Sequence, residues 1–142
     1  MELKAQFPPN ATVYWCPEIR AARVTWDKLF CNLDQFIEIC DYVIDLLKQH
    51  QANTWIVDTY ESNGVFAKGV QEYIQQTLIN RAIQNNITNV LTIVPQQKGL
   101  SSLSNKSWQK PVSNAGFVTG NFPDFETCRN WLLMQGNTRQ VS

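Results

Sequence analysis

Two runs of β-branched and aromatic residues open the pattern of apolar and polar positions along the chain. They read TVYWCP over residues 12–17 and IRAARVTW over residues 19–26. These residue types favour extended backbone, and the short polar break between the runs predicts an antiparallel pair of strands. Apolar side chains alternate along the second run as far as Trp26, with Arg23 and Thr25 between them. One face of this strand is therefore expected to be buried and the other wet.

A long amphipathic helix is predicted over residues 31–50. Its apolar side chains recur at intervals of three and four residues, which gathers them on one helix face. Asn32 is a suitable N-cap that Gln35 can reach back to, while Lys48 and His50 lie at the negative end of the helix dipole.

The rest of the chain alternates short apolar runs with helical patterns. Strands are predicted at TWIVDT (54–59), NVLTIVP (89–95) and, more weakly, AGFVTG (115–120). Helices are predicted over about 66–85, 101–110 and 124–136, the last with Asp124 as N-cap and Gly136 as its C-terminal stop.

This alternation predicts an α/β fold in a single domain over residues 1–142. Its mixed sheet begins with an antiparallel pair, becomes parallel through right-handed crossovers, and is flanked by about four helices in the order β-β-α-β-α-β-α-β-α. The core is expected to include Trp26, Ile56, Val57, Leu91 and Ile93.

Composition narrows the functional classes. Twelve basic residues balance twelve acidic ones, so binding to nucleic acid is not expected. The N-terminal residues lack the apolar stretch of a signal peptide and no segment resembles a membrane span, so we expect a cytoplasmic protein without membrane insertion. The four cysteines are widely spaced, which favours reduced thiols, and we expect no metal and no cofactor.

Several segments together resemble a known superfamily. They are Trp26 near a strand end, WIVDT, Tyr73 with Ile74, Arg81 with Ala82, a strand ending in VP, and FPDFETCRNWL. In this combination the chain is similar, over about residues 19–133, to the small bacterial proteins of the STAS/SEC14-like, anti-sigma-factor-antagonist-like superfamily. The resemblance implies a STAS-like domain that works through protein–protein contacts.

The resemblance also implies a regulatory serine at the start of a helix, where a phosphate would meet free backbone N–H groups. The nearest counterpart here is ESNG, which contains Ser62. Ser62 lies only four residues after Asp58, and Val65 and Phe66 occupy the expected helix start. We therefore interpret Ser62 as a turn residue and not as a phosphorylation site.

The turn after the WIVDT strand is the candidate functional site. We predict an interaction surface made of Asp58, Thr59, Glu61, Ser62, Val65, Phe66 and Lys68. Phe66 is its anchor if exposed, and the alternative is that Phe66 packs beneath the helix. Asp58 and Glu61 are expected to be solvated or to cap, and the single histidine, His50, cannot form a triad or a multi-histidine metal site. No catalytic residue is assigned.

A second, weaker candidate precedes the predicted helix 101–110. Lys98, Ser101 and Ser102 could hold an anion there, with a surface loop as the alternative. Two functions follow. The first is a non-enzymatic interaction or regulatory module that binds a protein partner or itself as a homodimer. The alternative is a small carrier that holds an apolar or lipid-like ligand between sheet and helices.

Overall fold

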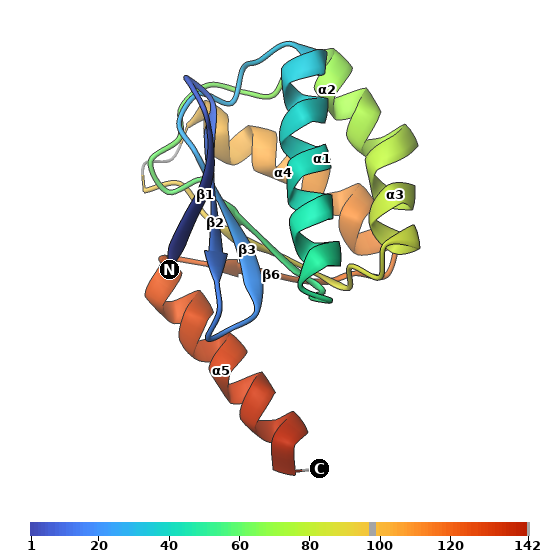
Figure 1. The fold of residues 1–142 in the computed structure, drawn as a ribbon. Coiled ribbons are helices and arrows are strands. Elements are labelled where there is room, and N and C mark those ends of the chain that lie inside the picture. Colours follow the sequence, from blue (N-terminus) through green and yellow to red (C-terminus); the bar gives the residue numbers. More distant parts are fainter. Residues whose placement is uncertain (97–98, 142) are drawn as a thin grey trace.

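The computed structural model describes residues 1–96 and 99–141, without the side chains of residues 100, 101, 103, 104 and 137–141. It is an α/β domain with one six-stranded mixed sheet (Figure 1). The strands are β1 (Glu2–Phe7), β2 (Ala11–Cys16), β3 (Ala21–Trp26), β4 (Thr54–Asp58), β5 (Asn89–Ile93) and β6 (Val118–Phe122). They lie in the sheet in the same order as in the chain. The predicted fold class is confirmed.

The sheet has one strand that the sequence did not reveal. β1 pairs antiparallel with β2, which itself forms the predicted antiparallel pair with β3. β1 lies at the edge of the sheet and is mostly exposed, with Leu3 55% accessible. Its sequence therefore lacks the apolar run that identifies a buried strand, because a strand exposed at the edge of a sheet needs few apolar side chains. The element order is β-β-β-α-β-α-β-α-β-α.

Strands β3 to β6 are parallel, and their crossovers run in one direction across the sheet. Right-handed crossovers that keep one direction place their helices on one face. This face carries α1 (Leu33–Gln49), the continuous helix α2 (Lys68–Tyr73), η1 (Ile74–Leu78) and α3 (Ile79–Gln84), and α4 (Leu100–Asn114). Among the helices in the described part of the chain, only α5 (Phe125–Val141) packs on the opposite face (Figure 1).

The helix ends agree with the sequence at some positions and differ at others. Asn32 caps α1 by accepting a hydrogen bond from the Gln35 N–H at 2.8 Å, and Asp124 accepts one from the Thr127 N–H at 2.8 Å. The predicted stop at Gly136 is wrong, because α5 continues to Val141. The helix predicted over 66–85 contains an unpredicted π-helical turn, η1.

The core is divided by the sheet into two parts. Trp26 and Val57 face α1 to α4, whereas Ile56, Leu91 and Ile93 face α5. All five are buried, as the sequence predicts. Burial of each large side chain stabilises the fold by roughly 1.5–3 kcal/mol. Since β4 and β5 bury side chains on both faces of the sheet, these strands hold the start of the loops that follow them in place.

Candidate functional site

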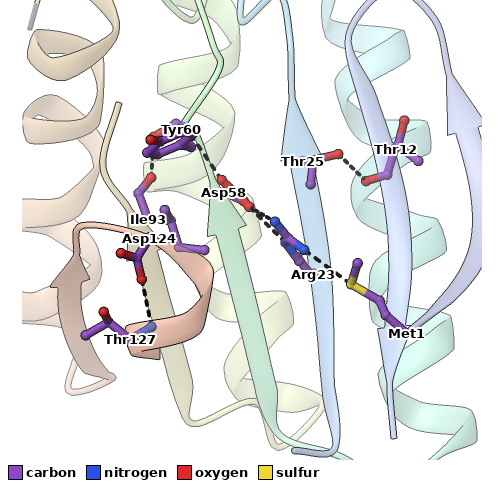
Figure 2. A network of polar contacts seen from close by, with 10 residues as sticks. Met1, Thr12, Arg23, Thr25, Asp58, Tyr60, Ile93, Asp124 and Thr127 are labelled. Carbon is purple, nitrogen blue, oxygen red and sulfur yellow. Dashed lines mark hydrogen bonds and ion pairs between the residues drawn. The ribbon is translucent and has the colours of Figure 1, made fainter. Parts of the chain in front are cut away.

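Asp58 ends β4 and forms a buried ion pair. Its side chain is only 4% exposed, and its Oδ2 lies 2.6 Å from Nη2 of Arg23 and 2.8 Å from Nε (Figure 2). Oδ1 accepts a hydrogen bond from the Tyr60 N–H at 3.1 Å. The predicted solvation is wrong, because the carboxylate is buried and paired with Arg23 on β3, whose guanidinium lies 3.9 Å from the centre of the Phe125 ring. Capping is limited to the turn hydrogen bond from Tyr60, because α2 begins only at Lys68.

Thr59 is fully buried and held on both sides. Its hydroxyl donates to the Ile93 carbonyl at 2.7 Å and accepts from the Asn105 side chain at 2.8 Å. The Asn105 carbonyl oxygen in turn accepts from the Trp108 indole at 3.1 Å. Thr59 therefore fastens the end of β4 to β5 and α4, and it is not part of an accessible surface.

Ser62 belongs to the turn, as expected. Its hydroxyl donates to the Thr59 carbonyl at 2.8 Å, and its N–H donates to the same oxygen at 3.1 Å. The helix begins only at Lys68. A phosphate on Ser62 would thus lie well before the helix N-terminus, where the free N–H groups are.

The predicted anchor Phe66 is in the core and not on the surface. It is 3% exposed, with ring centroids 5.2 Å from Trp26 and 5.4 Å from Phe36. Its placement as an exposed contact is therefore wrong, and the alternative of packing beneath the helix is correct. Of the remaining predicted residues, Glu61 and Lys68 are exposed while Val65 is half-buried.

A different phenylalanine is exposed at the same edge of the sheet. Phe30, between β3 and α1, is 69% exposed. Its carbonyl and that of Lys28 accept hydrogen bonds from the buried Asn10 side chain at 3.0 and 2.8 Å. The loop is also tied to the predicted site, since the Asn63 N–H donates to Asp27 and the Leu29 N–H donates to Asn63.

Backbone hydrogen bonds join these two loops into one surface. We call the exposed parts of residues 27–33 and 61–65 the Phe30 face. It includes Leu33, which is 38% exposed. The sequence analysis did not single out Phe30, because the Asn10 side chain that binds its carbonyl lies twenty residues away in the chain, and no local pattern reports such a contact.

The four cysteine side chains lie in the core, where burial keeps their thiols protonated. All four are buried and unpaired with one another. Burial raises the pKa of Cys16 to about 11 and that of Cys128 to about 12, and it also raises the pKa of Cys31 and Cys40. At neutral pH they are thiols and not thiolates, so they resemble small apolar core residues.

The other candidates contribute little. His50 caps the end of α1 and stacks on Trp15 with ring centroids 4.0 Å apart. Lys98 and the side chain of Ser101 lie outside the described residues, and Ser102 is half-buried in the first turn of α4. Within the described part of the chain, no three acidic, histidine or cysteine side chains are grouped to hold a metal ion.

An apolar cavity of about 70 Å³ lies between the sheet and the helices that cover it. Trp26, Trp55 and Trp108 contribute to its wall, together with Ile74 and Leu78 of η1. It lies where the sequence suggested space for an apolar ligand, although a volume this small does not accommodate a long acyl chain.

No protein-family model, curated protein or solved structure matches this chain. In residues 1–96 and 99–141, no helix is both long and apolar enough to cross a membrane. The fold alone does not define an activity, so the function has to be inferred from the Phe30 face, the buried Asp58 pair and the cavity.

Proposed function

We propose that this chain is a non-enzymatic interaction module of the STAS-like type, which acts through protein–protein contact at the Phe30 face. The observation that carries the proposal is the fixed display of Phe30, whose side chain is 69% exposed while its carbonyl is bound by the buried Asn10. An exposed aromatic ring on a preorganised loop loses little conformational entropy on binding.

Two further features support the proposal. The element order from β2 onward is the one predicted from the alternation of strand and helix patterns, and it is compatible with the STAS-like domain that we propose. The carboxylate and the hydroxyl that could take part in catalysis at this site already have partners inside the protein. Asp58 is paired with Arg23, and the Thr59 hydroxyl is hydrogen-bonded to Ile93 and Asn105. Neither is a free base or nucleophile, which favours recognition over catalysis at this edge.

The partner we propose is a second copy of this chain. The Phe30 face carries exposed charges of both signs, with Asp27 and Glu61 acidic and Lys28 basic. A twofold axis through such a face sets each copy against itself, so that an acidic group of one copy can meet a basic group of the other. A single exposed aromatic with few apolar neighbours predicts a weak, reversible homodimer and not an obligate one.

Sedimentation velocity over a concentration series tests this proposal. Phe30→Ser is expected to weaken association at least tenfold, a change of about 1.4 kcal/mol, with little loss of stability because the ring is exposed. The matched control is Ile83→Ser, which removes a 50% exposed side chain on α3 outside the Phe30 face. Equal dimerisation of wild type and Phe30→Ser, or a wild-type monomer at about 1 mM, contradicts the proposal.

The same assay distinguishes a constitutive contact from a phosphorylation switch. Ser62→Asp places a negative charge in the turn whose hydroxyl now binds Thr59. We expect association to stay within about threefold of wild type, or roughly 0.7 kcal/mol. A tenfold or larger change would instead support regulation through Ser62.

A further inference from the structure

The apolar cavity is walled almost entirely by carbon. Aromatic side chains make up much of the wall, namely Trp26, Phe36, Trp55, Phe66, Trp108 and Phe117. Aliphatic side chains from η1, α3, α4 and the sheet, together with Cys40 of α1, complete it. Protein interiors normally pack with few voids larger than a water molecule. A partly enclosed space of about 70 Å³ that is lined by large apolar side chains therefore requires an explanation.

The π-helical turn directly bounds this space. η1 contributes Ile74 and Leu78 to the wall, and the adjoining α3 contributes Ile79 and Ala82. A π turn closes its hydrogen bonds over one more residue than an α turn, is rare, and frequently occurs at functional sites. Here the wider turn lies on the cavity, whereas the neighbouring segments of the same helix are regular.

The cavity offers a ligand no unsatisfied polar partner. The Trp108 indole N–H is used by Asn105, and no described buried side-chain nitrogen or oxygen lacks a hydrogen bond. Burial keeps Cys40 protonated by raising its pKa. A buried water needs two to four polar partners and would not find them here, so the space favours a neutral, apolar occupant.

We propose that this cavity is a binding site for a small neutral hydrocarbon-like molecule of about three non-hydrogen atoms. The size follows from the volume, which is about half of the roughly 150 Å³ at which an engineered apolar cavity binds benzene or xenon. Leu78 and Val90 are half-buried and mark where the wall lies nearest to solvent. A ligand enters there, beside the π turn. This function is separate from the Phe30 face.

Xenon and benzene are the probes for the test. Xenon NMR and the tryptophan fluorescence of the full chain should both change saturably with probe concentration, because three tryptophans line the wall. The melting temperature should rise as the bound state gains stability with ligand concentration. Val112→Ala enlarges the cavity from α4 and is expected to tighten benzene binding about tenfold.

Two variants connect the signal to this cavity. Ala82→Leu adds three carbons to the wall and is expected to abolish the xenon response. Ile93→Val, the matched control, removes one carbon from the opposite, α5-facing core and should leave that response unchanged. An Ala82→Leu variant that keeps the full response overturns the proposal. So does the absence of a saturable response to both probes in wild type and in Val112→Ala.

Discussion

Removing Arg23 should destabilise the fold strongly, because it leaves the Asp58 carboxylate buried without its counter-ion. The carboxylate is 4% exposed and the Arg23 side chain 18% exposed. Breaking a buried pair from one side costs about 3–5 kcal/mol. Since Arg23 keeps some contact with solvent, we expect a loss near the lower limit, about 3 kcal/mol, for Arg23→Met.

The measurement is urea unfolding of the full chain, followed by circular dichroism. For a domain of this size a loss of about 3 kcal/mol corresponds to a fall in melting temperature of roughly 10 °C. Asp58→Asn in the Arg23→Met background should recover much of the loss, because the amide oxygen can still accept the Tyr60 N–H while no unpaired charge remains. The double-mutant cycle then isolates the interaction between the two side chains.

The exposed pair of Arg129 and Glu18 is the matched control. Its geometry is similar, with Nη2 of Arg129 3.0 Å from the Glu18 carboxylate, but the side chains are 34% and 51% exposed. Arg129→Met should therefore leave the unfolding midpoint nearly unchanged. If Arg23→Met costs less than about 1 kcal/mol, or no more than Arg129→Met, solvent screens the buried pair and our account of this site is wrong.

Three further predictions concern the core, the thiols and the acid response. Because the Phe66 ring is buried, Phe66→Ala should lower the free energy of unfolding in urea by about 3–5 kcal/mol and leave self-association in sedimentation unchanged. Unchanged stability with weakened association would show that Phe66 is a surface contact after all. With the pKa of Cys16 about 11 and that of Cys128 about 12, a thiol reagent at pH near 8 should label neither until denaturant is added. The hydrogen bond from the Thr127 N–H lowers the pKa of Asp124 below its usual 3.8. The ionised Asp124 therefore stabilises the folded protein fully above pH 3.8, and this contribution is lost as the pH falls through the pKa of the folded state. In Asp124→Asn, the helical circular dichroism signal should fall less steeply at acidic pH than in wild type. If the acid transition is unchanged in this variant, another group causes the transition.

The sequence was sufficient for the order of helices and strands from β2 onward because the signals there are local, although the last strand was predicted at 115–120 and β6 lies at Val118–Phe122. Continuous apolar character identified β4, and spacing of three and four residues identified α1. β1 was missed because an exposed edge strand needs few apolar residues. The π turn was missed because one extra residue within a helix barely alters the apolar periodicity.

The candidate site was harder to predict from the sequence, because its properties depend on contacts between residues that lie far apart in the chain. Arg23 alternates with apolar residues and reads as solvated, yet its partner Asp58 comes thirty-five positions later. Phe30 and Phe66 both neighbour a turn, and Phe66 is the buried one because its ring packs on Trp26 and Phe36. A pattern along the chain reports neither relation.

The agreement between strand order in the sheet and in the chain has a consequence for how the protein is made. Each strand pairs with the one synthesised just before it, so no strand waits for a partner that the ribosome has not yet produced. Successive hairpin and crossover units can dock as they emerge, which keeps contact order low for a mixed sheet and shortens the time that an unpaired edge is open to aggregation. The last strand to join, β6, extends an assembled sheet and does not insert into one.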